Sequence, residues 1–377
     1  NKYIEEEYQE EEEIEEFEEE DIYADKFTDK EIKSAYYNIP NFKEKFMKKN
    51  VLFLCFLAIA SLSFAQNNDF SLKFNTRADF DYQYIDNENI NDSYGFAGKF
   101  LNIMLDGKIN DKFEYHWRQR LNRTNFTSNF FEATDWAYLS YHINDNFTLS
   151  VGKQVVAIGG FEYDYAPIDV YFYSDFCNIM PSCYEFGTSL TWGFSQGQAL
   201  TFQISNSIFK QQPFDGLLAY NLLWNGNITD SWKTLYSVNL IEFRKNQYVN
   251  YVALGNQFYL GDFVIDLDYT NRYVNGMFFD DFTIVSQVKY QMPKLNVFAK
   301  FSYDRNNTDL TPDYPYGDYW TMTVAPGTDY MLYGAGVEYF PIKNSKDVRL
   351  HAIISSNNRE PANLFFNAGI TWNMKLK

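Results

Sequence analysis

The stretch that decides the fold is Phe70-Ser-Leu-Lys-Phe-Asn-Thr-Arg-Ala-Asp-Phe-Asp-Tyr-Gln-Tyr84, in which apolar and polar residues alternate almost without interruption. The residues of the apolar face are Phe70, Leu72, Phe74, Ala78, Phe80, Tyr82 and Tyr84. The opposite face carries polar and charged residues, among them Lys73 and Arg77. This period of two is typical of a β-strand whose faces meet two different environments. Fifteen residues is long for a strand of a soluble protein, where the average is about five or six.

The same alternation recurs along the chain from residue 66 onward. The runs predict about 16 strands, an even number like that of single-chain outer-membrane barrels. They are expected near 70–86, 95–110, 112–124, 134–143, 147–155, 185–194, 198–207, 217–228, 232–243, 247–260, 262–274, 281–291, 294–304, 328–340, 347–356 and 363–376. Many runs reach the length of about 9–11 residues that crosses a bilayer at a tilt. We therefore predict an all-β fold, a transmembrane antiparallel β-barrel, rather than a soluble β-sandwich.

The composition excludes several classes of protein. The chain has 377 residues, a formal net charge of −18 and an aromatic content of 20%. The acidic balance argues against nucleic acid as a partner, because binding a phosphate backbone needs clustered Lys and Arg. A negative mean hydropathy with one long apolar run argues against a bundle of membrane-spanning helices. Three Cys and three His offer little for metal binding, and we expect neither a metal nor a cofactor.

Three segments of the chain differ in chemistry. Residues 1–46 hold 17 acidic and 6 basic residues. Residues 47–65 are typical of a secretory signal peptide, with a basic start, a short apolar run and small residues before the cleavage point. Because a signal peptide stands at an N-terminus, we interpret 1–46 as an acidic upstream extension outside the native protein; the alternative is a disordered acidic tail. Residues 66–377 are the expected barrel domain, exported to the bacterial outer membrane after the signal peptide is cleaved.

Residues 155–184 form the longest stretch that lacks clean alternation, and Gly159-Gly160, Pro167 and Pro181 interrupt it. A loop so rich in aromatic residues should pack against another surface. We predict that it folds inward and narrows the pore; the alternative is an external loop that contacts other loops or a sister subunit. Its acidic residues are the candidates for the constriction: Glu162, Asp164, Asp169 and Asp175.

Two cysteines remain once the signal peptide is removed, Cys177 and Cys183. Export places them in an oxidising compartment, so we expect them to form a disulfide that stiffens the loop. The alternative is a pair of unpaired thiols.

Charged residues on the polar faces of the strands are candidates for lining the pore. They are Lys73, Arg77, Glu114, His116, Arg118, Arg120 and Lys153. Arg118 and Arg120 alternate on one face, where their guanidinium groups could bind oxyanions through paired hydrogen bonds. The alternative is a salt-bridge network, with Glu114 and acids of neighbouring strands, that only holds the wall.

Two stretches resemble the phosphate-selective porin O and P family. They are Tyr115-His-Trp-Arg-Gln-Arg-Leu-Asn122 and Val151-Gly-Lys-Gln-Val-Val-Ala-Ile-Gly-Gly-Phe-Glu-Tyr-Asp164, the latter followed by Pro167-Ile-Asp-Val-Tyr-Phe-Tyr-Ser174. The resemblance implies a 16-stranded trimeric porin whose third external loop enters the channel. It also implies a ladder of arginines and clustered lysines, whereas this chain mixes its basic candidates with Asp79, Asp81 and Glu114.

These observations predict an outer-membrane porin and no enzyme. The expected function is passive diffusion of small hydrophilic solutes or ions, including anions such as phosphate, through a homotrimer in outer-membrane lipid. The alternative is a non-conducting barrel that serves as a surface adhesin or structural anchor. Gly193-Phe-Ser-Gln-Gly197 has the spacing of a hydrolase nucleophile elbow, but that motif needs a strand-to-helix turn, and this one joins two expected strands.

Overall fold

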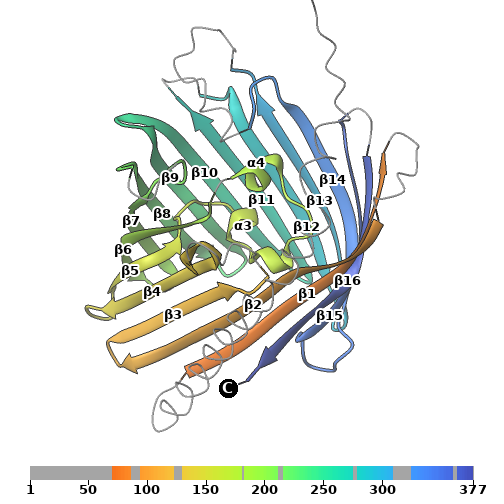
Figure 1. Ribbon diagram of the computed structural model, residues 1–377, viewed down its shortest axis with the longest axis horizontal. Coiled ribbons are helices and arrows are strands. Elements are labelled where there is room, and N and C mark those ends of the chain that lie inside the picture. The colour runs from red at the N-terminus through yellow and green to blue at the C-terminus, as the bar shows by residue number, and fades with distance from the viewer. Residues whose placement is uncertain are drawn as a thin grey trace, which may run out of the picture. The chain divides into compact units, whose positions relative to one another are not determined.

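The computed structural model describes residues 70–85, 94–122, 130–180, 182–210, 215–274, 278–308, 324–359 and 363–376 (Figure 1). They belong to the second of two compact units, Asn68–Lys377. The predicted segments 1–46 and 47–65 lie outside the described residues. Within the described part of the chain, no helix is both long and apolar enough to cross a membrane.

Sixteen antiparallel strands make one closed barrel in the described unit. Each strand pairs with its neighbours in the sequence, and β1 closes the ring against β16, where Arg77 lies opposite Thr371. The strands are β1 (Phe70–Ile85), β2 (Tyr94–Asn110), β3 (Phe113–Arg120), β4 (Thr134–His142), β5 (Phe147–Val155), β6 (Tyr184–Ser195), β7 (Gln198–Asn206), β8 (Leu218–Thr229), β9 (Trp232–Arg244), β10 (Gln247–Leu260), β11 (Phe263–Tyr273), β12 (Asp281–Gln291), β13 (Leu295–Asn306), β14 (Asp329–Tyr339), β15 (Val348–Asn357) and β16 (Asn363–Lys375). The predicted fold class is confirmed, since each expected run coincides with one strand.

The two ends of the barrel differ in their connections. At one end the strands are joined by the turns 111–112, 143–146, 196–197, 230–231, 261–262, 292–294 and 340–347; we call this the short-turn end. Gly197 and Gly261 adopt φ values of 72° and 63° in two of these turns, a conformation that glycine reaches without steric cost. Most connections at the opposite end are longer, above all 121–133, 156–183 and 307–328, whereas 245–246 and 358–362 are short. This asymmetry is typical of outer-membrane barrels.

Side chains alternate between the two faces of the wall, with the apolar ones outside. On β13, Val297 and Phe301 are 41% and 40% exposed, whereas Ser302 and Asp304 on the inner face are fully buried. The same pattern holds around the ring of strands, where many charged and amide side chains are buried on the inner face. Because water is absent from a bilayer, a closed barrel with an apolar exterior satisfies every strand hydrogen bond without solvent.

The helical elements of the described residues are short and all lie in connections. They are the 3₁₀ helices η1 (Phe130–Ala133) and η2 (Pro167–Asp169) and the α-helices α3 (Phe161–Asp164) and α4 (Asp175–Ile179). Three of them belong to the segment between β5 and β6, residues 156–183, which we call the inward loop.

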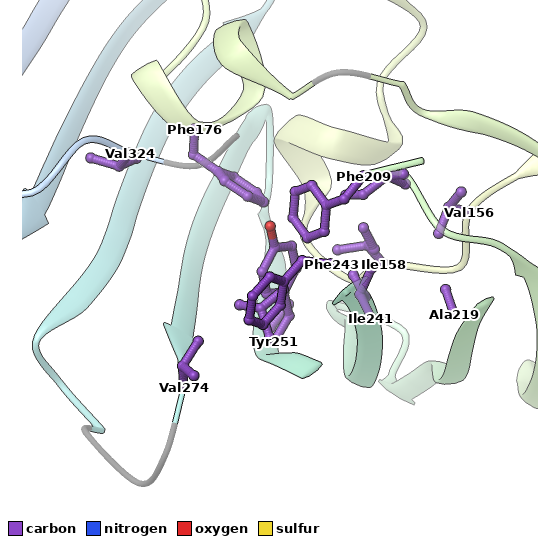
Figure 2. Close-up of a cluster of buried hydrophobic side chains, with 13 residues drawn as sticks. Val156, Ile158, Phe176, Phe209, Ala219, Ile241, Phe243, Tyr251, Val274 and Val324 are labelled. Carbon is purple, nitrogen blue, oxygen red and sulfur yellow. The ribbon is translucent and has the colours of Figure 1, made fainter. Parts of the chain in front are cut away.

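An apolar cluster lies on the inner side of the barrel rather than on its outer surface (Figure 2). The inward loop contributes Val156, Ile158 and Phe176, and the following connection contributes Ile208 and Phe209. The wall strands β8 to β10 contribute Ala219, Ile241, Phe243, Val249, Tyr251 and Ala253. Burying these side chains together stabilises the loop against the wall, at about 25 cal/mol for each Å² removed from water.

Candidate functional site

The inward loop crosses the inside of the barrel, as the sequence predicts. Its backbone and side chains contact inward-facing residues of β7, β9, β11, β13, β14, β15 and β1. These contacts span more than half of the ring of strands. The alternative of an external loop is therefore wrong, and the loop restricts the lumen.

The first part of the loop lies directly on the wall. Ala157 N donates to Gln203 Oε1 at 2.8 Å, and Gly159 N donates to Ser237 Oγ at 2.8 Å. A Cβ at Gly159 would lie 2.5 Å from the carbonyl oxygen of Leu235, which is closer than real contacts allow. Gly160 adopts a φ of 102°, which favours glycine. The Gly159-Gly160 pair is therefore required by this close approach.

Two wall carboxylates bind the first backbone N–H groups of the loop helices. Asp268 of β11 accepts from Phe161 N and Glu162 N at 2.9 and 2.8 Å, at the start of α3. Asp304 of β13 accepts from Asp175 N and Phe176 N at 3.0 and 3.1 Å, at the start of α4. The first N–H groups of a helix lack intrahelical partners and attract negative charge, so these carboxylates fix both helices to the wall.

A buried ion pair joins the middle of the loop to β13. Lys300 Nζ donates to Glu162 Oε1 at 2.5 Å and to the carbonyl oxygen of Phe172 at 2.6 Å. Ser174 N and Ser174 Oγ donate to the same carboxylate at 2.8 and 2.5 Å. Burial by itself would raise the pKa of the Glu162 carboxyl, but Lys300 and Ser174 outweigh that effect and lower it. Glu162 therefore holds the loop rather than facing a solute.

Arginine and tyrosine side chains fasten the far end of the loop. Arg77 Nη1 donates to the carbonyl oxygens of Ile168 and Val170 at 3.3 and 2.9 Å. The guanidinium of Arg77 also lies 4.6 Å from the ring centroid of Tyr171, whose hydroxyl donates to Glu338 at 2.9 Å. Arg77 therefore serves as an anchor of the loop.

The predicted constriction residues fall into different environments. Glu162 is buried in the ion pair described above. Asp169 Oδ1 lies 2.8 Å from Arg349 Nη2, and Asp175 Oδ2 lies 3.0 Å from Arg359 Nη2. Asp164 is exposed. Among the four, Asp164 and Asp169 keep the most contact with the lumen.

Arg118 and Arg120 both point to the inner face of β3, where they share one carboxylate. Asp135 lies 2.9 Å from Arg118 Nε and 2.8 Å from Arg120 Nε. The Arg118 guanidinium also packs 4.6 Å from the ring centroid of Trp136 and is almost fully buried. This is a salt-bridge network of the kind expected as the alternative, although its partner is Asp135 rather than Glu114.

Glu114 and His116 lie with other polar side chains near the short-turn end. His116 Nδ1 lies 2.9 Å from Asp106 Oδ1, and His142 Nε2 lies 3.4 Å from Glu114 Oε2. Lys108 Nζ lies 2.9 Å from Glu114 Oε1. In the described residues, no group of three or more His, Cys, Asp or Glu is arranged to hold a metal ion.

Lys73 and Lys153 were both predicted to line the pore. Lys73 lies on β1 opposite Met104. The prediction for Lys153 is wrong. Lys153 pairs in register with Ala137 and with Phe186, on the outward face of the wall. Its Nζ donates to the carbonyl oxygen of Phe131 at 2.8 Å. The alternation of β5 itself places Lys153 with the outward-facing Val151, so it does not line the pore.

The predicted disulfide is not formed in the structure. Cys177 lies in α4 and packs against the apolar cluster. Cys183 Sγ instead contacts Met180 Sδ at 3.8 Å. Burial raises the pKa of the Cys177 thiol well above its ordinary value, which keeps it protonated. The hydrolase spacing Gly193–Gly197 also lacks the strand-to-helix turn that the motif needs, because it covers the end of β6 and the turn 196–197 that leads into β7.

Several residues that hold the site were not identified from the sequence. They are Asp135, Asp268, Lys300, Asp304, Glu338 and Arg349. All are charged and all lie on the inner faces of strands. For five of them the alternation with apolar neighbours indicates that they face inward, whereas Asp135 turns inward at a register shift between β3 and β4. The contacts that each one makes are set by long-range packing.

A closed sixteen-stranded barrel with an apolar exterior, a polar interior and a loop fastened inside it defines an outer-membrane β-barrel of the porin class. Residues 70–231, from β1 to the turn after β8, match the model of the family described as phosphate-selective porin O and P. This match confirms the family resemblance of the sequence motifs. No curated protein gives a significant match.

Solved structures of porins share this fold at low sequence identity. The outer membrane channel DcaP of Acinetobacter baumannii has 11% identity and a TM-score of 0.57, covering 82% of this chain and 98% of its own. OmpT of Vibrio cholerae in its trimer form has 13% identity and a TM-score of 0.55, with coverage of 82% and 100%. A mutant of the Rh. blastica porin has 11% identity and a TM-score of 0.53, with coverage of 82% and 100%.

Proposed function

We propose that this protein is an outer-membrane channel through which small hydrophilic solutes and ions diffuse passively. The observation that carries the proposal is the inward loop, which narrows a polar lumen while its own contacts with the wall hold it in one place. A fixed restriction of this kind sets an upper size for solutes and exposes them to the charges of the lining.

The charges in the lumen favour a weak ion preference of the channel rather than a dedicated phosphate-binding site. The inward basic groups Arg77, Arg272 and Lys300 are buried and paired, two of them with the loop. Arg118 and Arg120 share the single carboxylate of Asp135, so this cluster keeps one excess positive charge. We propose that anions such as phosphate pass as small solutes, with this cluster as the source of any anion preference.

The state of assembly and the route of export belong to the same proposal. OmpT of Vibrio cholerae is described in a trimer form, and we propose a homotrimer in outer-membrane lipid for this chain. Residues 47–65 would act as the cleaved signal peptide, and residues 1–46 would be absent from the native protein.

A second candidate function is a non-conducting barrel that serves as an adhesin or anchor. The observation that favours it is the apolar cluster inside the wall, which fills part of the lumen with packed side chains. Conductance of the purified, refolded chain from residue 66 in planar bilayers separates the two functions. Discrete conductance steps support diffusion, whereas silence in several salts would favour the filled barrel.

The ion preference is tested separately by the reversal potential in a salt gradient. Replacing both Arg118 and Arg120 by Ala leaves Asp135 without its cationic partners and makes the lumen more negative. We expect the reversal potential to shift toward cation preference. An unchanged reversal potential would remove this cluster from the account of selectivity.

A further inference from the structure

A cavity of 340 Å³ lies between the inward loop and the wall of β11 to β16. The loop bounds this cavity on one side and inner-face residues of the wall bound it on the other, so a solute held there narrows the lumen further. Its lining includes Lys289 and Gln291 of β12, Phe340 and Lys346 of the short turn 340–347 between β14 and β15, and Arg349 of β15. These positions place the cavity at the short-turn end of the barrel.

Aromatic rings form an apolar floor in this cavity. Tyr171 of the loop stacks on Phe298 of β13, with ring centroids 5.6 Å apart and planes inclined by 14°. A Cβ at Gly336 would lie 2.8 Å from the Phe298 ring, so only glycine lets the ring lie flat on β14. Phe172 and Phe340 complete the set of rings. These rings give an otherwise polar cavity one apolar face.

Cationic groups in the cavity have donors to spare. Lys289 Nζ lies 3.7 Å from Glu338 Oε2, beyond hydrogen-bond distance, and 5.8 Å from the ring centroid of Phe298. Lys346 Nζ lies 5.5 Å from the centroid of Phe340. In the described residues, Arg349 Nε has no hydrogen-bond partner.

The carboxylates of the cavity are already engaged. Glu338 accepts hydrogen bonds from Tyr171 and from Asn296 and is shared between Lys289 and Arg349. Asp266 accepts from Tyr165, Gln257 and Gln287, and Asp268 accepts from the backbone of α3. Asp169 also lines the cavity and is half exposed, with its Oδ1 2.8 Å from Arg349 Nη2. The donors that remain for a solute beside the aromatic surface are those of Lys289 and Lys346.

We propose that this cavity binds a small organic carboxylate. The carboxylate group accepts a charge-assisted hydrogen bond from Lys289, and the apolar body of the solute lies on Phe298 and Phe340. Inorganic phosphate offers the charge without the apolar body and binds more weakly. This inference deepens the proposed function, since it rests on solutes reaching the lumen and names a class that is retained there.

The test compares three probes that separate charge from apolar contact: benzoate, inorganic phosphate and benzyl alcohol. Blockade of the current through the full, purified protein in planar bilayers gives the affinity of each probe. We expect benzoate to block at a concentration about tenfold lower than either of the others, since each lacks one of the two interactions. Calorimetric titration of the detergent-solubilised protein with the same probes gives a second measurement that does not depend on conductance.

Lys289 is the informative position because its contacts among the described residues are with Glu338 and Phe298 of the wall. Lys289→Met should weaken benzoate binding about tenfold, and Lys289→Arg should retain it. Lys108→Met is the matched control, an exposed lysine near the same end of the barrel whose carboxylate partner is Glu114. It should bind benzoate like the unchanged protein.

Equal binding of benzoate and phosphate overturns the cavity site, as does a Lys289→Met variant that binds benzoate normally in a folded barrel. A channel that conducts in both cases leaves the proposed function intact. A protein that never conducts removes diffusion as the function, and calorimetry then decides the cavity by itself.

Discussion

Single residues decide how closely the inward loop approaches the wall. Gly159 lies against the backbone of β9, and Gly160 lies against Gly255 of β10, where a Cβ would be 2.7 Å from Gly160 Cα. Glu162 is buried beside Lys300. The alternation of the sequence predicted the inward direction of Arg118 and Arg120 correctly. The shared partner Asp135 was not predictable, because it comes from the neighbouring strand β4 and depends on register.

Gly159→Ala should loosen the loop. The added methyl group meets the carbonyl oxygen of Leu235 at 2.5 Å, and this oxygen belongs to the backbone of β9, which cannot shift easily. We expect a destabilisation of about 1–3 kcal/mol, with a larger and noisier conductance. Gly95→Ala is the control, since nothing lies within 4 Å of its added Cβ. If the two variants had the same conductance and the same thermal unfolding, the close contact between Gly159 and the backbone of β9 would be contradicted.

The Glu162 carboxyl should make the stability of the inward loop depend on pH in the acidic range. Its pKa in the folded protein is lower than the ordinary value of 4.5, so its contribution to stability is present above that value. The contribution is lost as the pH falls below 4.5 through the folded-state pKa. We expect conductance noise from the loop to rise in that range. Glu162→Gln should remove the dependence, and a noise profile that stays the same in this variant would assign it to another group.

Lys300→Met should be more damaging than Glu162→Gln. It leaves the buried Glu162 carboxylate without its cation, which costs about 3–5 kcal/mol in comparable buried pairs. Glu162→Gln leaves a neutral amide that can still bond to Ser174. Urea unfolding of both variants measures the difference, and an equal loss of stability would show that the pair contributes little.

At the scale of elements, strands and loop are stabilised by different interactions. The strands hydrogen-bond to their neighbours around a closed ring, and their polar and apolar faces are visible in the sequence. The loop is held by side chains from distant strands such as β11 and β13. Period-two patterns therefore predicted nearly every strand. They could not predict the loop contacts, which depend on which wall residue lies opposite each loop residue.

Replacing residues 161–179 by a short Gly-Ser linker should leave the barrel intact. The removed segment contributes no strand pairing, so the ring of strand hydrogen bonds is unchanged. We expect a several-fold larger conductance and a preserved shift between heated and unheated bands on mild SDS gels. Loss of the folded band would mean that the loop is required for the barrel itself.

At the scale of the whole barrel, the described strands carry apolar side chains on the outer face and polar side chains on the buried inner face. Val151 and Leu254 are exposed on the outer face, while Arg272 and Asn239 are fully buried inside. Lipid around the barrel explains the apolar outer face, and water inside it explains the polar inner face. The prediction for Lys153 was wrong because it followed the charge of the side chain. The position of Lys153 in the alternation of β5 places it on the outer face of the wall, opposite Phe186.

The most direct test of this account is the single-channel conductance of the purified chain from residue 66 in planar bilayers. We expect discrete conductance steps that scale with salt concentration and become larger when residues 161–179 are replaced by the linker. A correctly folded barrel that stays silent in every salt, with and without the inward loop, would contradict it.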